Sequence, residues 1–377
     1  MRLLQEIPVK ELRGATVLLR SGFNVPLNEK NEVVDDLRIR RALASIRFLM
    51  NAGARVVILG HIGREADETL SPVVQRLQRD IPQAHFIAGS PIGADARIAI
   101  ATMRDGDVIV LENVRSDARE GKGDLSYAQE LASLGSMYIG DAFPDSHRAH
   151  ASITGVPSLV PHAMGIALAD EVHHLTRALQ PQQPSLAIVA GAKFETKEPL
   201  IRTLLKKYTD VFVGGALAND LLKARGYSVG ASLISDGAVP DDVAHNDHVL
   251  APLDVIVERD GRAVASALSE IQTSDIIVDI GPLTSAFLKT KVAAARFIVW
   301  NGPLGWYEKG FTQGSRALAQ AIAETQTTSV IGGGDTVAAI ETATFNPEHV
   351  FTFVSAGGGA MLEFLLEGSL PGIDALK

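Results

Sequence analysis

The stretch Ser329–Ala338, SVIGGGDTVA, joins an apolar run to a helical pattern through three consecutive glycines. Val330 and Ile331 are typical of a buried strand, and Asp335 and Thr336 are typical of the start of a helix. Glycines at such a junction let the backbone approach a ligand closely, and the helix start offers unpaired N–H groups to an anion. The same residues also fit a tight turn capped by Asp335, so the stretch predicts a strand–turn–helix unit and leaves its role open.

The same alternation of apolar, β-branched runs with amphipathic helical patterns extends over the whole chain. We expect strands at ATVLLR (15–20), ARVVILG (54–60), DVIVLEN (107–113), SMYIGDAF (136–143), SLAIVAGAK (185–193), DVFVGGAL (210–217), LDVIVERD (253–260), SDIIVDIG (274–281), RFIVWNG (296–302), TSVIGGG (328–334) and HVFTFVSAGGG (349–359). Continuous apolar strands separated by helices indicate parallel sheets that are covered on both faces. The predicted fold class is therefore α/β, with two doubly wound, Rossmann-like parallel-sheet domains joined by a hinge helix.

The boundary between these domains is predicted near HAMGIALADEVHHLTRALQ (162–180), which reads as one helix before the breaker-rich PQQP. A chain of 377 residues is long enough for two cores, because single cores seldom exceed roughly 250–300 residues. We expect 1–162 and a returning C-terminal segment, 361–377, to form the first domain. The linker helix is expected at 163–182 and the second domain at 183–360.

Composition restricts the function. The net charge of −9 argues against non-specific binding to nucleic acid, although it allows a local basic pocket for a small anion. The absence of cysteine removes disulfides, thiolate metal sites and cysteine nucleophiles, which is typical of a cytoplasmic protein. No apolar run reaches the ~18 residues of a membrane span, and the first residues are too polar for a signal peptide. We expect a cytoplasmic enzyme or binding protein.

Ligands of such folds bind at the carboxyl ends of strands, so the residues that follow each strand are informative. In the first half these residues are Arg20 with Asn24, His61 with Arg64, Arg115, and Arg148. In the second half they are Gly191 with Lys193, Gly214 and Gly215, Gly281, Gly302, 332–334 and 357–359. Repeated arginines in an acidic protein indicate a small, multiply charged anion, and the bare backbone of the second half suits a nucleotide phosphate chain.

Several common motifs do not occur. The chain has no G-x-x-x-x-G-K-[ST] and no G-x-G-x-x-G after a strand, which weakens a P-loop or dinucleotide-binding interpretation. It also has no G-x-S-x-G of a serine hydrolase.

Taken together, a series of stretches resembles the phosphoglycerate kinase family over almost the whole chain. These stretches are LRSGFNVP, DDLRIR, HIGR, LENVR, GDAF with HRAHAS, GAKFETK, GGALANDLLK, DIGP, VWNGPLGWYE, GGGDTVAA, and SAGGGA with LEG and LPG. The resemblance implies reversible phosphoryl transfer between ATP and the carboxylate of 3-phosphoglycerate, which gives ADP and 1,3-bisphosphoglycerate. It also implies Mg²⁺ bound with the nucleotide, a monomer, and a hinge-bending motion that joins the substrates.

Residue by residue, the resemblance implies two sets of binding residues. The set for the phosphoglycerate is Gly22, Phe23, Asn24, Arg38, His61, Ile62, Gly63, Arg64, Arg115 and Arg148. The set for the nucleotide is Lys193, Lys197, Gly214, Asn301, Glu308, Gly333, Gly334, Asp335 and Thr336. Within these sets Asp335 is expected to face the magnesium ion and Glu308 the ribose. Arg38 and Lys193 are the implied catalytic residues, which stabilise the transition state.

The implied chemistry agrees with the motifs that are missing. A carboxylate acceptor has a reference pKa of about 3.3–3.7 and is ionised near neutral pH, so it needs no general base. Catalysis then consists of positioning and of cations and backbone N–H groups that stabilise the transferring phosphoryl group.

Two departures from the family pattern fall in the acceptor site. Gly22 stands where the family has an aspartate that holds the glycerate hydroxyl, and Pro144-Asp145-Ser146 replaces Gly-Thr-Ala before His147. Losing one charge-assisted hydrogen bond weakens binding by roughly 1.5–3 kcal/mol. We hypothesise that Asp145 restores the carboxylate; an exposed loop aspartate is the alternative.

Smaller departures lie on the nucleotide side, where Ala190 and Ala216 replace glycines and Ala356 replaces a threonine. Three alternative functions stay open at this point. The first is a non-catalytic relative that binds a nucleotide or phospho-ligand, which Gly22 favours but which has no need of Arg38 and Lys193. The second is a kinase for a different small carboxylate. Without the resemblance, a two-domain glycosyl transferase would be the third.

Overall fold

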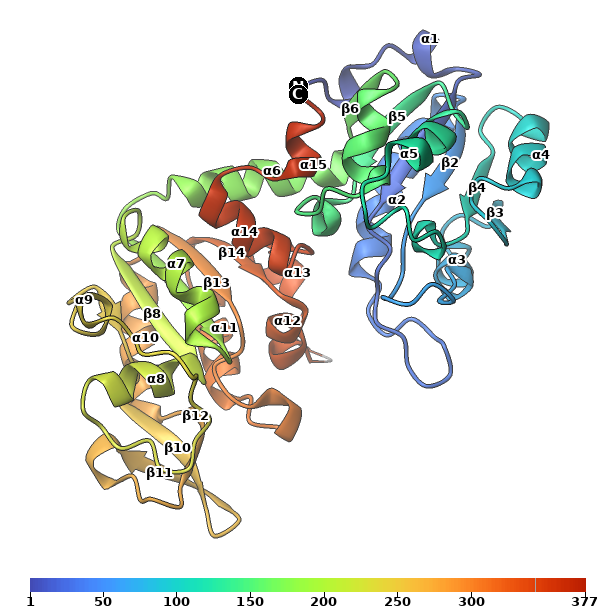
Figure 1. Ribbon diagram of the computed structural model, residues 1–377. Coiled ribbons are helices and arrows are strands. Elements are labelled where there is room, and N and C mark those ends of the chain that lie inside the picture. The colour runs from blue at the N-terminus through green and yellow to red at the C-terminus, as the bar shows by residue number, and fades with distance from the viewer. Residues whose placement is uncertain (343) are drawn as a thin grey trace. The chain divides into compact units, whose positions relative to one another are not determined.

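The computed structural model describes residues 1–342 and 344–377, which form two compact units (Figure 1). The first unit comprises Met1–His173 and Ser369–Lys377, and the second comprises His174–Gly368. The boundary falls inside helix α6 (Ile166–Leu179). The C-terminal segment of the first unit begins at Ser369, later than the predicted 361, because helix α14 (Gly359–Glu367) belongs to the second unit.

The first unit is built on a six-stranded parallel sheet with the strand order β3-β4-β2-β1-β5-β6. Its strands are β1 (Thr16–Ser21), β2 (Arg55–Leu59), β3 (Ala84–Ile87), β4 (Val108–Leu111), β5 (Met137–Asp141) and β6 (His162–Met164). Its helices are α1 (Val9–Leu12), α2 (Leu37–Asn51), α3 (Ser71–Leu77), α4 (Ala94–Thr102), α5 (Leu125–Ala132), the start of α6, and α15 (Pro371–Asp374). Short helical turns lie at η1 (Leu4–Glu6), η2 (Val114–Ser116), η3 (Phe143–Asp145), η4 (Ala151–Gly155) and η5 (Val156–Ser158).

Strand β1 lies inside this sheet, between β2 and β5, and its burial explains its composition. Val17 and Leu19 are fully buried, in one core with Ile46 and Leu49 of α2. A strand covered on both faces favours such a continuous apolar run. The core holds the carboxyl ends of β1, β2, β4 and β5 at one edge of the sheet, where the predicted arginines follow.

The second unit contains a second six-stranded parallel sheet, with the order β15-β14-β13-β7-β8-β9. Its strands are β7 (Ser185–Gly191), β8 (Asp210–Gly215), β9 (Val249–Leu250), β13 (Phe297–Asn301), β14 (Thr328–Gly332) and β15 (Phe353–Ser355). Its helices are the end of α6, α7 (Phe194–Leu205), α8 (Leu217–Ala224), α9 (Asp241–Ala244), α10 (Pro282–Ala294), α11 (Gln313–Ala323), α12 (Gly334–Ile340), α13 (Pro347–Val350) and α14, with turns η6 (Leu268–Glu270) and η7 (Tyr307–Lys309).

The fold class predicted from the sequence is confirmed, with two local corrections. LDVIVERD and SDIIVDIG form β10 (Asp254–Arg259) and β12 (Ile276–Ile280) of a separate antiparallel sheet, in which β11 (Arg262–Ala267) completes the order β11-β10-β12. The second correction concerns 162–180, which is not one helix. Residues 162–164 are strand β6, because they pair with β5 at the open edge of the first sheet, and α6 begins only after Gly165.

Candidate active site

The loop after β1 connects three segments at the carboxyl edge of the first sheet. The Asn24 side-chain oxygen accepts a hydrogen bond from the Gly63 backbone N–H at 2.9 Å. The Asn24 carbonyl accepts a hydrogen bond from the Arg38 guanidinium, at the start of α2. One asparagine therefore fixes both the loop after β2 and an arginine that the sequence predicted as catalytic.

The loop that carries His61 and Gly63 is held by residues that follow β4. The buried Asn113 amide donates hydrogen bonds to the carbonyls of Ile62 at 2.9 Å and Glu68 at 2.8 Å. Arg115 donates to the Gly63 carbonyl at 2.5 Å. Gly63 has φ of +64°, and the Glu68 carboxylate occupies the place of a Cβ atom, so only glycine suits this position.

Behind these loops lies a buried group of charges centred on Arg20. The Arg20 guanidinium donates to Ser152 Oγ at 2.9 Å, to the Ser21 carbonyl at 2.6 Å and to Asp145 Oδ2 at 3.1 Å. It also lies 3.2 Å from His61 Nδ1. Ser152 in turn donates to Glu120 Oε1 at 2.5 Å. All five side chains are buried, so this network fixes their positions through paired charges.

The charges of this group shift one another's ionisation. Burial alone would raise the pKa of Asp145, but His61 and Arg20 outweigh it and hold that pKa well below its usual range. Burial lowers the pKa of His61, and Asp145 opposes that shift. Burial, Arg115 and Arg148 lower the pKa of His150 to about 4. The histidines are therefore neutral near pH 7, while Asp145 is ionised.

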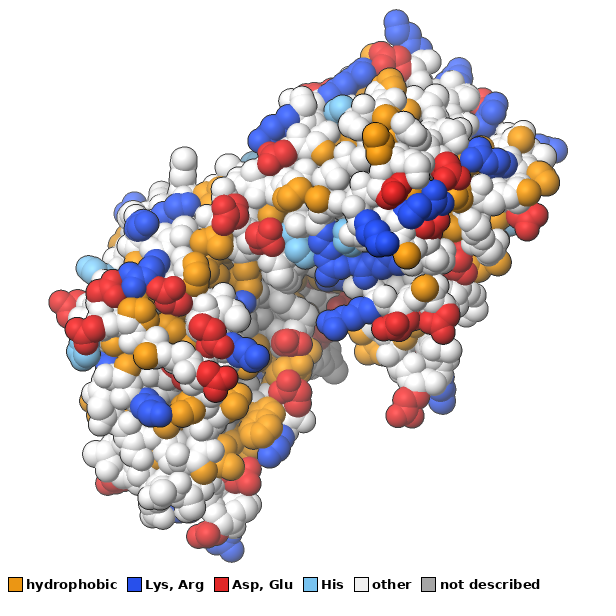
Figure 2. Space-filling model, in the orientation of Figure 1, with side chains coloured by type: hydrophobic (Ala, Val, Ile, Leu, Met, Phe, Trp, Pro, Cys, Tyr) orange, Lys and Arg blue, Asp and Glu red, His pale blue; other side chains and the backbone are white. Residues whose placement is uncertain are grey.

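Most residues predicted for the phosphoglycerate lie in this one region. Arg38 acts on the ionisation of Asp145, and Arg148 and Arg20 act on that of Arg115, so these cations share one electrostatic field. Phe23 and Ile62 are buried and support the loops, while Arg64 is exposed. Figure 2 shows Lys and Arg side chains gathered with histidines on the first unit. Clustered cations of this kind attract a multiply charged anion.

In the second unit, the GGGDT segment forms the predicted strand–turn–helix junction. Gly333 has φ of +102° between β14 and α12. Thr336 is buried, and its hydroxyl oxygen accepts from the Gly302 N–H at 2.8 Å and donates to the Gly332 carbonyl at 2.9 Å. Asn301 donates to that same carbonyl at 2.8 Å. Asn301 and Thr336 therefore shape the loop from behind.

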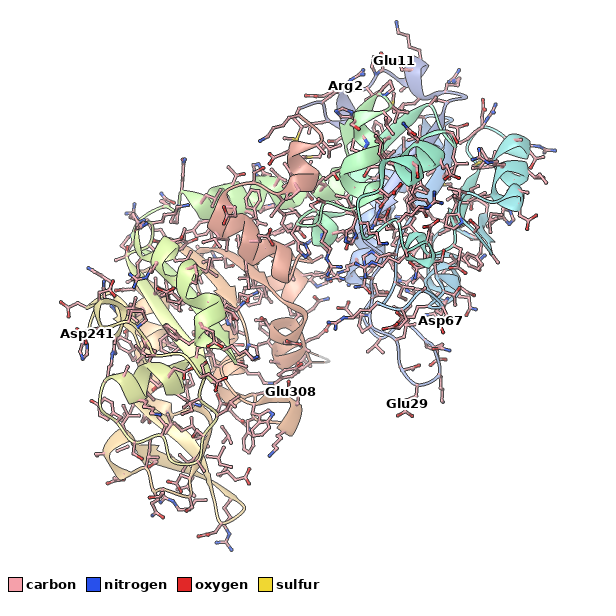
Figure 3. All side chains as sticks on the ribbon, in the orientation of Figure 1. Arg2, Glu11, Glu29, Asp67, Asp241 and Glu308 are labelled. Carbon is pink, nitrogen blue, oxygen red and sulfur yellow. The ribbon has the colours of Figure 1, made fainter. Side chains whose placement is uncertain are left out.

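A cavity of about 290 Å³ lies beside this junction, within the second unit. It is lined by Gly191, Ala192, Gly215, Ala216, Asn219, Leu233, 276–279, 303–308 and Asp335. Its walls combine apolar side chains with glycines and three carboxylates, and its size suits part of a nucleotide. Of the predicted nucleotide residues, Glu308 and Asp335 line the cavity; Glu308 is labelled in Figure 3.

The remaining predicted residues of this side lie around the cavity. Lys193 is exposed at the N-cap of α7, and Lys197 follows it on that helix, where burial lowers its pKa. Gly214 supports the packing, because a Cβ there would lie 2.7 Å from Leu304 Cδ2. Gly334 is exposed at the start of α12. Ala216, one of the departures from the family pattern, lines the cavity wall.

Sequence reasoning did not find several residues of these sites. Asn113, Glu120 and Ser152 hold loops and charges in the first unit. In the second unit the Tyr307 hydroxyl donates to Asp335 Oδ1 at 2.8 Å, and burial raises the pKa of Asp279, in the cavity wall, to about 6. In the sequence, Tyr307 is marked only by its place in the segment VWNGPLGWYE. Its hydrogen-bond partner, Asp335, lies 28 residues further along the chain.

An arginine-rich region on one unit and a glycine-lined cavity on the other are features of a two-domain phosphotransferase. The phosphoglycerate kinase family model matches residues 6–369. Phosphoglycerate kinase of Pelodictyon phaeoclathratiforme is 39% identical, and the alignment covers 97% of this chain and 97% of that relative. Phosphoglycerate kinase of Gloeobacter violaceus is 37% identical, and the alignment covers 99% of this chain and 98% of that relative. The chain belongs to the phosphoglycerate kinase family, and its acceptor group is a carboxylate.

Solved structures agree with this assignment. Phosphoglycerate kinase from Coxiella burnetii has a TM-score of 0.82 and 36% identity, and covers 97% of this chain and 96% of its own. The enzyme from Pyrococcus horikoshii has a TM-score of 0.88 and 27% identity, with 100% and 98% coverage. Among the described residues, none of the helices has the length and apolar character needed to cross a membrane.

Proposed function

We propose that the acceptor site of this kinase is the cationic region of the first unit and that its nucleotide site is the cavity and GGGDT junction of the second. The reaction is phosphoryl transfer between ATP and the carboxylate of 3-phosphoglycerate, giving ADP and 1,3-bisphosphoglycerate. The observation that carries the proposal is the electrostatic field shared by Arg20, Arg38, Arg115 and Arg148 around the buried pair Asp145 and His61. A cluster of cations of this kind suits an acceptor with both a phosphate and a carboxylate.

In this proposal each loop of the first unit binds part of the acceptor. Arg115 and Arg148, with Arg64, bind the phosphate, because guanidinium groups match phosphate geometry. His61 and Asn24 bind the carboxylate end, next to Arg38. The network behind them holds these groups in place before the ligand arrives, which lowers the entropy cost of binding.

On the second unit, Glu308 binds the ribose, and Lys193, Lys197 and the backbone of 333–334 bind the phosphates. Mg²⁺ is held in proteins by one or two carboxylates together with nucleotide phosphates. Asp335 is exposed, and Tyr307 occupies only its Oδ1, so its Oδ2 suits such an ion. When bound, Mg²⁺ supplies positive charge that neutralises the phosphate oxygens.

The proposed catalytic residues act on charge alone. The acceptor carboxylate is already ionised near neutral pH, so no side chain has to remove a proton. Arg38 and Lys193 stabilise the negative charge that spreads over the transferring phosphoryl group. The monomeric state, cytoplasmic location and hinge-bending motion predicted from the sequence stay predictions.

The test is 3-phosphoglycerate-dependent turnover of ATP, coupled to reduction of the 1,3-bisphosphoglycerate formed. We expect turnover in the native chain and losses of about 100-fold or more in kcat for Arg38→Ala and Lys193→Ala. Lys289→Ala, on α10, removes an exposed ion pair with Glu324; it serves as the control and should keep full activity. ATP binding without turnover would contradict the proposed function and favour a non-catalytic relative.

A further inference from the structure

A side chain at position 22 would be tightly packed. Gly22 is buried after β1, and a Cβ there would lie 3.2 Å from Pro144 Cδ and 3.4 Å from Pro144 Cγ. Pro144 therefore covers the face of Gly22. The glycine and the proline form one packed unit, although the sequence separates them by more than 120 residues.

The residue after Pro144 places a carboxylate beside that unit. Asp145 ends the turn η3, and its side chain is 5% exposed. Only Oδ2 is used within the described chain: Arg20 lies 3.1 Å from it and His61 Nδ1 3.4 Å. No described residue donates a hydrogen bond to Oδ1, so half of a buried, ionised carboxylate still has acceptor capacity.

This placement is unexpected in a site for an anion, because a carboxylate repels phosphate and carboxylate groups. The repulsion is reduced by the surrounding arginines, but it is not removed. A carboxylate becomes favourable for binding only where the ligand offers it a hydrogen-bond donor. The carboxylate and phosphate of 3-phosphoglycerate are ionised at neutral pH, and the 2-hydroxyl is the group that offers such a hydrogen.

We infer that Asp145 is the specificity-determining residue that accepts the hydrogen bond of the acceptor's hydroxyl group through Oδ1. The inference rests on the proposed acceptor site. Asp145 selects a 2-hydroxy acid over the corresponding deoxy acid, because the deoxy ligand leaves a buried carboxylate facing an anion without compensation. A charge-assisted hydrogen bond predicts a preference of about 10- to 100-fold.

A purely structural role for Asp145 makes a different prediction. Arg20 is buried and needs a counterion, and Asp145 is in direct contact with it. If this pairing were the whole role, removing the charge would shift Arg20 and change the affinities of all anionic ligands in parallel. The hydroxyl preference would then be unchanged, so the ratio of two affinities separates the two roles.

The experiment compares binding of 3-phosphoglycerate with binding of its 2-deoxy analogue, 3-phosphooxypropionate, by calorimetry on the full chain. Asp145→Asn keeps the shape of the side chain and removes its charge. We expect the native preference for the hydroxyl ligand to fall to about threefold or less, with the analogue bound as well as before or better. Asp105→Asn, which changes an exposed carboxylate of the same unit, is the control and should keep the native ratio.

A parallel change in the affinities of both ligands in Asp145→Asn, with their ratio unchanged, would overturn the inference and leave Asp145 as a counterion. A native chain that binds neither ligand would instead contradict the proposed function, so the two failures are distinct. If Asp145→Asn folds poorly, a variant in which the carboxylate is moved to a different residue serves as the test instead. In Gly22→Asp with Pro144→Gly and Asp145→Thr, the proline is removed and the carboxylate moves to position 22.

We expect this triple variant to regain a hydroxyl preference of at least tenfold, whereas Pro144→Gly with Asp145→Thr alone does not. If the ratio of the affinities for the hydroxyl ligand and its deoxy analogue is equal in these two variants, that result would also count against the inference. Circular dichroism and the unfolding midpoint of each variant verify that folded chains are compared.

Discussion

At the scale of single residues, His61 shows how burial sets the role of a side chain. His61 Nδ1 lies 3.2 Å from the Arg20 guanidinium and 3.4 Å from Asp145 Oδ2, so both of its neighbours belong to the buried group of charges. The Nε2 atom is buried and has no partner among the described residues. Nε2 is therefore the ring nitrogen of His61 that a ligand can use, and burial lowers the pKa of the ring.

Tyr307 acts on the nucleotide side through one hydrogen bond. Its hydroxyl holds Asp335 Oδ1 at 2.8 Å, which orients the carboxylate that we propose faces Mg²⁺. We expect Tyr307→Phe to raise the KM for Mg-ATP by about tenfold, the lower end of the range for partners of metal ligands, because both residues are near solvent. Steady-state kinetics at several Mg²⁺ concentrations measure this effect.

The matched control for this change is Tyr227→Phe, on an exposed tyrosine of the same unit. It should leave the KM unchanged. If Tyr307→Phe also leaves the KM for Mg-ATP unchanged at limiting Mg²⁺, the hydrogen bond has no part in metal binding.

The sequence allowed some of these residues to be predicted because strand ends of parallel sheets converge. Arg20 lies near the end of β1, His61 and Arg115 follow β2 and β4, and the three meet at one edge, as that rule requires. The partner of Asp145 could not be predicted this way, because Arg20 lies 125 residues earlier and the contact depends on how the turn η3 packs. Pairings between loops are set by tertiary packing, and no local pattern records them.

At the scale of elements, the loop after β2 depends on a residue that follows β4. The two hydrogen bonds from Asn113 to Ile62 and Glu68 are buried, and they replace solvent for two backbone carbonyls. We expect Asn113→Ala to destabilise the chain by about 1–3 kcal/mol and to raise the KM for 3-phosphoglycerate at least fivefold, roughly the same energy scale. Urea unfolding and acceptor kinetics measure the two effects.

The KM for ATP should change little in that variant, because the residues that we propose bind ATP lie on the other unit. Asn28→Ala, which removes hydrogen bonds of an exposed turn, provides the control. Equal changes in the two KM values for Asn113→Ala would show that the loop is not the cause.

Helix α6 begins over a buried carboxyl group whose protonation depends on pH. Asp141 Oδ1 accepts the Leu168 N–H at 3.0 Å, and burial raises the pKa of Asp141 to about 7. The folded chain therefore keeps a proton that the unfolded chain loses near pH 4, so the free energy of unfolding falls as pH rises from about 4 to about 7. Between pH 5 and 8 the ionisation of Asp141 lowers the free energy of unfolding by roughly 2–3 kcal/mol.

In Asp141→Asn this group no longer titrates, so we expect the loss of stability between pH 5 and 8 to be smaller than in the native chain by that amount. Urea unfolding at the two pH values measures the difference. Asp95→Asn, on the exposed side of α4, is the control. An identical loss in the native chain and in Asp141→Asn would exclude Asp141 as the titrating group.

Elements also show where sequence patterns mislead. The runs that form β10 and β12 look like buried parallel strands, yet they pair antiparallel with β10 in the middle. Apolar periodicity records burial, and it does not record strand direction. Strand β6 was not predicted for a related reason: it has three residues, which are too few to interrupt a helical pattern.

At the scale of the whole molecule, the end of the chain completes the unit in which the chain began. Leu370, Ile373 and Leu376 are buried in the first unit. The Leu376 side chain covers Gly140 of β5, and the Gly372 N–H donates to the Ser146 carbonyl at 2.8 Å. The last nine residues therefore pack against the turn that carries Asp145, so a discontinuous unit connects its C-terminus to its acceptor site.

This arrangement predicts that a change at the C-terminus affects one substrate. Ile373→Ala removes buried methyl groups and should destabilise the chain by about 2–4 kcal/mol. Because Ile373 lies beside Gly372, which holds Ser146, we expect the KM for 3-phosphoglycerate to rise several-fold while the KM for ATP stays near its native value. Leu283→Ala, on a side chain that is 65% exposed in the second unit, should change neither quantity. Urea unfolding and kinetics with each substrate varied in turn measure these effects. A parallel rise of both KM values would mean that the C-terminal segment contributes only to global stability, whereas a rise confined to 3-phosphoglycerate would show that it positions the Pro144–Ser146 turn.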